Sequence, residues 1–206
     1  MEQNEPIVLK RCKYFTADRG YDDHKLILKL QDRYEIKPVI AIRNMWKDGE
    51  ETKLLSGQTN VVYDYCGTVS CYCPQNGTPR QMAFGGFERD RQTLKYRCPA
   101  VHYGIKCAGK EKCPVGKAIR IPLKEDPRIF TPVARSSYKW KELYNMRTAA
   151  ERINSRLDVS FGFERHFIRG QKKMQFRAGL ALCVMLAMAV GRIKEKQPGK
   201  MRSLVA

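Results

Sequence analysis

Two acidic side chains occupy positions that suit the binding of divalent cations. Asp18 directly follows Cys12–Ala17, a short apolar segment that predicts a β-strand. Glu151 belongs to a long helical pattern in which Tyr144, Arg147 and Glu151 share one predicted helix face. Enzymes that cleave phosphodiesters with two metal ions hold those ions with carboxylates, which are best placed on rigid strands and helices. The two acids are therefore candidates for a phosphoryl-transfer site.

Each pattern also has an ordinary structural explanation. Asp18 and Gly20 could form a turn in which the glycine adopts a positive φ. Arg147 and Glu151 could form a surface ion pair between successive helical turns, worth only a few tenths of a kcal/mol. From spacing alone, these ordinary explanations are the stronger ones.

The residues around Asp18 predict a parallel α/β unit. Asp22 and Asp23 suit the start of a helix, where acids face the positive end of the helix dipole. The helical period that follows ends before Pro38, and Val39–Arg43 predicts a second buried strand. A strand, a helix and a strand within about thirty residues form a parallel pair.

The rest of the chain predicts a β-rich segment followed by helices. From about Asn44 to Arg135 the sequence has short alternating runs, many Gly and Pro, and six of the eight cysteines. Helical periodicity then covers Ser136–Asp158 and Gln171–Lys194. Within the last helix, the apolar run Ala178–Val190 is 13 residues long, which is too short to span a membrane and suits a buried helix.

The charge is strongly and unevenly positive. The chain has 39 Lys and Arg against 21 Asp and Glu, a formal net charge of +18. Residues 1–60 hold 11 basic and 10 acidic side chains, whereas residues 80–120 hold 10 against 3 and residues 160–206 hold 10 against 2. Such an excess favours nucleic acid as the partner over a basic surface that is merely solvated. Arg169, Lys172 and Lys173, at the start of the last helix, are candidate DNA contacts.

Two separate motifs resemble those of DDE transposases from bacterial insertion sequences. The stretch "YFTADRGYDD" is similar to the Asp-x-Gly-Tyr-Asp segment that carries the second catalytic aspartate of these enzymes. The stretches "YNMRTAAERINSRLD" and "FGFERHFIRGQKKMQFRAGLALCVMLAMAV" resemble their carboxyl-terminal part. The signature there is Tyr, two residues, Arg, three residues, Glu, six residues and Lys. It coincides with Tyr144, Arg147 and Glu151, while Asp158 stands in place of the lysine.

The resemblance implies an RNase H-like fold with an Asp–Asp–Glu triad that uses Mg²⁺ or Mn²⁺ to cut and join DNA. Asp18 would be the second acid and Glu151 the third, both as metal ligands. Tyr144 and Arg147 would contact DNA near the cleaved phosphate, and Arg156 would replace the missing lysine imperfectly. Insertion-sequence ends and target DNA would be the partners, with a homodimer as a family expectation.

The chain departs from the family pattern at its start. Residues 1–17 contain no aspartate that could serve as the first catalytic acid. We therefore expect a truncated RNase H-like α/β fold with a β-rich, cysteine-containing insertion. Its expected segments are residues 1–43 with Asp18, the insertion 44–135, and the carboxyl-terminal helices 136–206 with Glu151.

The cysteines of the insertion suggest two alternatives. They have irregular spacing and no paired Cys-x-x-Cys knuckles, so free reduced thiols are the leading interpretation and Zn²⁺ bound by four of them is the other. These six candidate zinc ligands are Cys66, Cys71, Cys73, Cys98, Cys107 and Cys113. Cys12 and Cys183 lie in apolar surroundings and are expected in the core.

Three functional interpretations remain open. The first is a transposase fragment that works when the missing part is supplied, for example by a second chain encoded upstream. The second is a basic, non-catalytic DNA-binding remnant, stabilised by zinc if the cysteines bind it. A weaker third is a nuclease of the same fold. With no apolar signal segment at the start of the sequence, the expected location is the bacterial cytoplasm, at the nucleoid and not at a membrane.

Overall fold

The computed structural model describes residues 10–202 and divides the chain into two compact units, Met1–Arg147 (unit 1) and Thr148–Ala206 (unit 2). It has a mixed α/β architecture, as expected. The division of the chain into segments 1–43, 44–135 and 136–206 stays a prediction.

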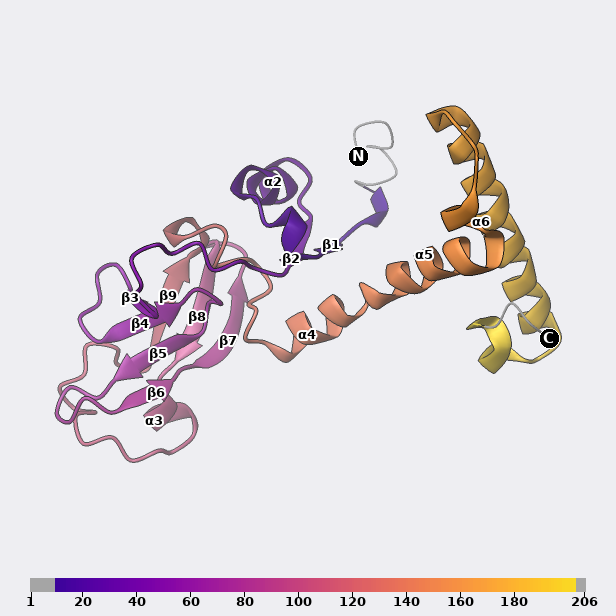
Figure 1. Cartoon of the computed structure of the whole chain (residues 1–206). Coiled ribbons are helices and arrows are strands. Elements are labelled where there is room, and N and C mark those ends of the chain that lie inside the picture. Colours follow the sequence, from indigo (N-terminus) through magenta and orange to yellow (C-terminus); the bar gives the residue numbers. More distant parts are fainter. Residues whose placement is uncertain (1–9, 203–206) are drawn as a thin grey trace. The chain divides into compact units, whose positions relative to one another are not determined.

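Unit 1 begins with the predicted parallel pair. Strand β1 (Tyr14–Ala17) pairs in parallel with β2 (Lys37–Ile40), so that Ala17 lies opposite Ile40. Between them lie a 3₁₀ turn (Arg19–Tyr21), helix α2 (His24–Leu28) and a π-helical turn (Lys29–Arg33) (Figure 1). One face of this segment buries a small apolar cluster: Ala17, Ile27, Leu30, Tyr34, Ile36 and Ile40.

The middle of unit 1 consists of two antiparallel sheets. The first contains β3 (Thr52–Leu54), β4 (Val61–Asp64), β5 (Val69–Tyr72) and β6 (Pro79–Gln81), in that order. The second contains β7 (Ala83–Glu88), β8 (Thr93–Arg97) and β9 (Ala118–Pro122). A single-turn helix, α3 (Pro99–His102), and a 3₁₀ turn (Leu123–Glu125) follow β8 and β9 respectively.

One hydrophobic cluster draws on both sheets. Alternate residues point into it, such as Val61 and Tyr63 from β4 and Leu94 and Tyr96 from β8. Phe130, which follows the last strand, is fully buried in the same cluster, with its ring 5.1 Å from that of Tyr63. The segment that the sequence predicted as β-rich therefore has a substantial core.

The helix predicted over residues 136–158 is two helices. Helix α4 (Tyr138–Asn145) is capped by the Ser137 hydroxyl, and a turn at Met146 and Arg147 separates it from α5 (Thr148–Phe161). No glycine or proline marks this break, so residue pattern could not reveal it. Helix α4 packs on β2 through contacts of Leu143 with Val39.

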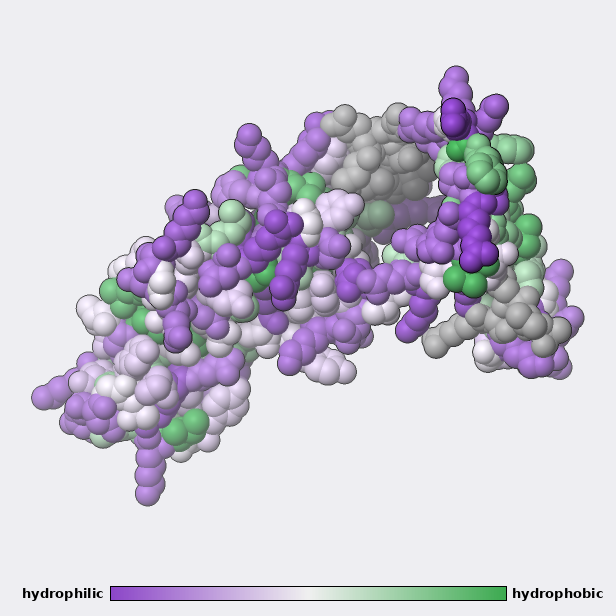
Figure 2. Space-filling view, in the orientation of Figure 1, coloured by the Kyte–Doolittle hydropathy of each residue, from purple (hydrophilic) through white to green (hydrophobic). Residues whose placement is uncertain are grey.

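Unit 2 contains α5, a 3₁₀ turn (Phe163–Arg165), α6 (Gln171–Lys194) and a last 3₁₀ turn (Pro198–Arg202). The bounds of α6 match the prediction, but its expected burial does not, because Ala181 is its one buried residue among those described. Apolar side chains lie exposed along it, as the green surface over α6 in Figure 2 shows. Cys183 on this helix is exposed, as is Cys12, so both were wrongly expected in the core.

Candidate functional site

Asp18 lies at the carboxyl end of β1, where a 3₁₀ turn begins. Its Oδ1 accepts a hydrogen bond of 2.9 Å from the Gly20 amide, and its carboxylate is exposed. A Cβ atom at Gly20 would lie 3.0 Å from that oxygen, although Gly20 itself does not have a positive φ. A larger residue at this position would have to displace the Asp18 carboxylate, and the positive-φ explanation is wrong.

Asp22 has a tertiary role that the sequence did not show. Its side chain is 0% exposed and accepts hydrogen bonds from Arg128 Nη2 (2.7 Å) and Arg128 Nε (3.2 Å). The other donor is the Arg43 amide, at 2.8 Å, and the Arg43 guanidinium donates to the Arg19 carbonyl at 2.7 Å. Arg43, just after β2, therefore holds both ends of the turn that follows Asp18, and Arg128 of the β-rich part holds the Asp22 end.

Two arginines, half-buried Arg128 and buried Arg135, strengthen this connection. The hydrogen bond that Arg128 donates to Asp22 raises the pKa of Arg128, against the effect of burial. Arg135 donates to the carbonyls of Ile129 (2.7 Å) and Ile40 (3.3 Å), and burial lowers its pKa to about 10. A guanidinium stays protonated at neutral pH even then. Both arginines lie in the irregular chain after β9. Through Asp22 and the Ile40 carbonyl they connect that chain to the segment that contains β1 and β2.

Tyr144 and Arg147 lie together, as their predicted spacing requires. The Arg147 guanidinium lies over the Tyr144 ring at 5.2 Å, and Tyr144 stacks on Trp140 at 4.6 Å. Such a contact orients a guanidinium for binding a phosphate or a base plane.

Glu151 is not on the same helix as this pair. It is exposed in the first turn of α5, and Arg156 follows on that helix, half-buried. The single continuous helix expected for Tyr144, Arg147 and Glu151 is therefore wrong, whereas their shared face stays a prediction.

The two acids proposed as metal ligands lie in different compact units of the chain. Asp18 belongs to unit 1 and Glu151 to unit 2. Among residues 10–202, no three His, Cys, Asp or Glu side chains form a group that could hold a metal ion as they stand. The first catalytic acid of the family was expected near the start of the chain, and residues 1–9 lie outside the part that the structure describes.

Three of the predicted DNA contacts of unit 2 are exposed. Arg169, Lys172 and Lys173 surround the start of α6. A shallow hollow of about 520 Å³ lies here, lined by Ile168, Lys172, Lys173, Phe176, Arg177 and Leu180. An exposed aromatic ring between cations is typical of surfaces that bind nucleic acid.

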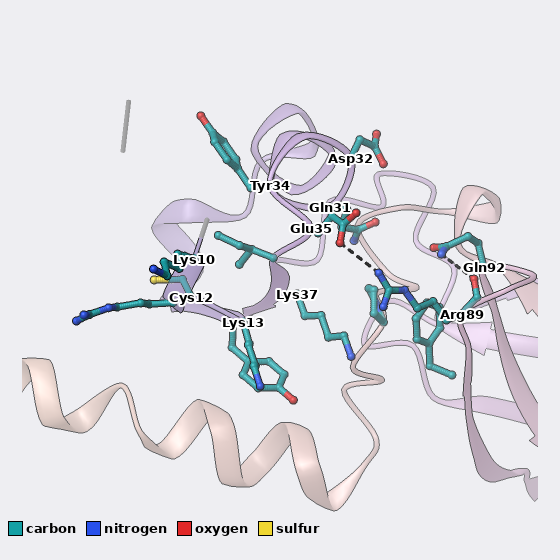
Figure 3. Close-up of a pocket in the computed structure, with 15 residues that line it drawn as sticks. Lys10, Cys12, Lys13, Gln31, Asp32, Tyr34, Glu35, Lys37, Arg89 and Gln92 are labelled. Carbon is teal, nitrogen blue, oxygen red and sulfur yellow. Dashed lines mark hydrogen bonds and ion pairs between the residues drawn. The ribbon is translucent and has the colours of Figure 1, made fainter. Parts of the chain in front are cut away.

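A second basic pocket, in unit 1, was not predicted. It has a volume of about 570 Å³, and five of its lining residues are cations: Lys10, Arg11, Lys13, Lys37 and Arg89 (Figure 3). Its acids are Asp32 and Glu35, and Glu35 pairs with Arg89 at 3.2 Å. The run Lys10–Lys13 was visible in the sequence, whereas Arg89 comes from the turn after β7.

One helix among the described residues, α6, is long and apolar enough to cross a membrane by length and composition alone. The prediction rested on the uninterrupted apolar run Ala178–Val190, whereas the whole helix Gln171–Lys194 is longer and apolar on average.

Comparison with known proteins gives one match. The family model described as "Transposase DDE domain" matches residues 2–187, nearly the whole chain and both acid-bearing motifs. No curated protein and no solved structure matches. The chain belongs to the transposase DDE domain family.

Proposed function

We propose that the chain is the DNA-cleaving and strand-transferring part of an insertion-sequence transposase, with Asp18 and Glu151 as two of its three catalytic acids. The observation that carries this proposal is the exposed carboxylate of Asp18 at the end of a parallel strand, within a family match that covers both acids. Ligands of open α/β sheets gather at this end of the strands.

The donor set suits the metal ions that this family uses. Asp18 and Glu151 are exposed carboxylates, and carboxylate oxygens are the ligands that Mg²⁺ and Mn²⁺ prefer. Asp18 and Glu151 would hold the ions, which when bound supply Lewis-acid activation of the attacking and leaving oxygens. The Gly20 amide orients the Asp18 carboxylate through Oδ1.

Tyr144 and Arg147 serve DNA binding in this proposal. The ring holds the guanidinium in one orientation, so less side-chain freedom is lost when Arg147 pairs with a phosphate. Arg156, Arg169, Lys172 and Lys173 add sequence-independent phosphate contacts, and the unit 1 pocket provides a further basic surface.

The first acid comes, in this proposal, from outside residues 1–206, such as from an upstream-encoded fragment. The purified chain alone should bind duplex DNA and leave supercoiled plasmid uncut in Mg²⁺ or Mn²⁺, because two carboxylates do not complete the metal cage. Adding the upstream polypeptide should produce nicking.

Matched variants identify the acids. Nicking by the mixture should disappear in Asp18→Asn and in Glu151→Gln, and should persist in the exposed controls Asp90→Asn and Glu195→Gln. Nicking that survives both catalytic substitutions contradicts the assignment. Nicking by the chain alone that needs Asp18 and Glu151 would show that the active site is already complete.

A non-catalytic DNA-binding remnant is the second candidate. The observation that favours it is that residues 1–17 contain no aspartate to serve as the first catalytic acid. DNA binding without nicking, with or without the upstream polypeptide, would support this second function.

A further inference from the structure

The basic pocket of unit 1 lies at the opposite end of the β1–β2 pair from Asp18. Its residues Lys10–Lys13 precede β1, and Lys37 is the first residue of β2, opposite Tyr14 in the parallel register. The pocket is thus at the amino ends of the two strands, whereas Asp18 follows the carboxyl end of β1. A strand of 4 residues is about 13 Å long. A group bound in the pocket is therefore remote from the Asp18 carboxylate.

Most of the positive charge in this pocket has no acidic partner. Five cations line it against two acids, and one of these acids, Glu35, is paired with Arg89 at 3.2 Å (Figure 3). The other acid, Asp32, is exposed. Among the described residues, no acid forms an ion pair with the remaining four cations, here called the pocket cations: Lys10, Arg11, Lys13 and Lys37. A concave surface with this excess of charge attracts polyanions.

Two aromatic rings line the pocket beside these cations. The Lys37 ammonium lies 6.0 Å from the centre of the Tyr14 ring and 5.9 Å from the centre of the Phe87 ring, so both rings hold the same cation. Tyr14 is also 37% exposed, which leaves ring surface for a ligand. The bases of an unpaired nucleic-acid strand stack on such rings while cations hold its phosphates. Bases within a duplex are already stacked on each other, so they do not use such a ring.

The size of the pocket and one of its donors also suit a nucleotide. The volume of about 570 Å³ is within the range of about 300–1,000 Å³ that is typical of small-molecule sites. Gln31 lines the pocket, and its Nε2 is buried with no hydrogen-bond partner among the described residues. Because buried donors are usually paired, an acceptor oxygen of a ligand is a suitable partner for this nitrogen.

We propose that the basic pocket binds an unpaired segment of DNA, with one base stacked on Tyr14 and the neighbouring phosphates paired with the pocket cations. The inference rests on the proposed function in one respect, the identity of the polyanion as DNA. It does not depend on the roles of Asp18 and Glu151. Since the pocket is remote from Asp18, the segment bound here flanks the phosphate that is cleaved.

Fluorescence anisotropy of a labelled oligothymidylate tests the stacking contact. A length of about 12 nucleotides is suitable, because single-strand sites cover about 4–16. Tyr14→Leu in the full-length chain should weaken binding about fivefold or more, the loss expected for one stacked base. Tyr103→Leu, at another exposed tyrosine of unit 1, is the control and should leave the affinity unchanged. If a duplex of the same length binds as tightly and is equally sensitive to Tyr14→Leu, the unpaired segment is excluded.

A pair of variants with equal charge tests the pocket cations. Replacement of Lys10, Arg11 and Lys13 by Gln should lower the slope of log K against log salt for the single strand by about 2, since each phosphate contact contributes about 0.7. The control carries the same change at three exposed lysines of unit 1 that do not line the pocket: Lys106, Lys110 and Lys112. It should retain the wild-type slope, and equal reductions in the two variants would overturn the proposal.

Photocrosslinking locates the strand without relying on variants that could fail to fold. An oligonucleotide that carries a photoreactive thymine should crosslink to the wild-type chain at Tyr14 or within the peptides that line the pocket. Unlabelled single strand should compete, and polyglutamate should not. Crosslinks confined to other peptides, or equal competition by polyglutamate, would contradict the proposal. Asp18→Asn and Glu151→Gln should keep the crosslink, so failure of the pocket is distinguishable from failure of the catalytic assignment.

Discussion

At the residue scale, the buried pair of Asp22 and Arg128 is the strongest link between the segment that carries Asp18 and the rest of unit 1. Its partners are 106 residues apart in sequence, and the carboxylate also accepts the Arg43 amide. Because Asp22 lies four residues after Asp18, the pair fixes the turn that follows the carboxylate proposed as catalytic. The pair is therefore a positioning element as well as a stabilising one.

Asp22→Asn should destabilise the chain by roughly 3–5 kcal/mol, because it leaves Arg128 charged and only 16% exposed without its anion. Urea unfolding measures this loss. Glu142→Gln, which breaks the exposed pair with Lys139, is the control and should leave the unfolding free energy unchanged within error. Equal effects of the two substitutions would contradict the role given to burial.

Asp23 and Asp22 show which residue roles can be read from sequence. Asp23 caps α2 by accepting the Leu26 amide at 2.8 Å, a local interaction that its position predicts. In the sequence, Asp22 looks equivalent to Asp23 as a helix-start acid. Its partner is Arg128, which follows β9, so its role depends on the tertiary fold. The family motif made Asp18 and Glu151 candidates for catalysis, which stays a prediction, whereas the contact between Gly20 and Asp18 is visible only in the structure.

At the element scale, regular periodicity predicted β1, β2 and the bounds of α6, and non-local packing determined the remainder. The break between α4 and α5 has no breaker residue, and the seven strands of the middle segment are too short for their pairing to be inferred. The buried cluster that both sheets share orders that segment, and some side chains add links across a sheet. Glu88 on β7 accepts hydrogen bonds from Arg120 on β9 at 2.7 and 3.2 Å, across the intervening β8.

Glu88→Gln should lower the Tm at neutral pH by a small amount, and this difference should vanish in acid. The Arg120 hydrogen bond lowers the pKa of Glu88 in the folded chain, so the pair stabilises the fold above the ordinary glutamate pKa and is lost as pH falls through the lowered one. Thermal unfolding of both proteins at pH 7 and at about pH 2, well below the ordinary value of about 4.3, provides the comparison. A Tm difference that persists in acid would show that the effect is not due to the ion pair.

At the scale of the whole molecule, positive charge is concentrated in unit 2. Residues 148–206 carry 12 Lys and Arg against 4 Asp and Glu, a net +8, while residues 1–147 carry 27 against 17, a net +10 over more than twice the length. Composition predicted a polyanionic partner, and family membership identifies it as DNA. Composition could not show that the cations at the start of α6 flank an exposed aromatic ring, since that depends on how the loop before α6 folds.

Substitution of Arg169, Lys172 and Lys173 by Gln should weaken DNA binding and reduce its salt dependence. Each lost phosphate contact lowers the slope of log K against log salt by about 0.9, so three contacts correspond to about 2.7. Fluorescence anisotropy of a labelled duplex over a salt series measures both quantities. The control replaces Lys194, Lys196 and Lys200, which are exposed at and beyond the other end of α6, for the same change in charge. If both triple variants reduce the slope equally, binding follows net charge alone; if only the first does, the basic surface at the start of α6 contacts the DNA backbone.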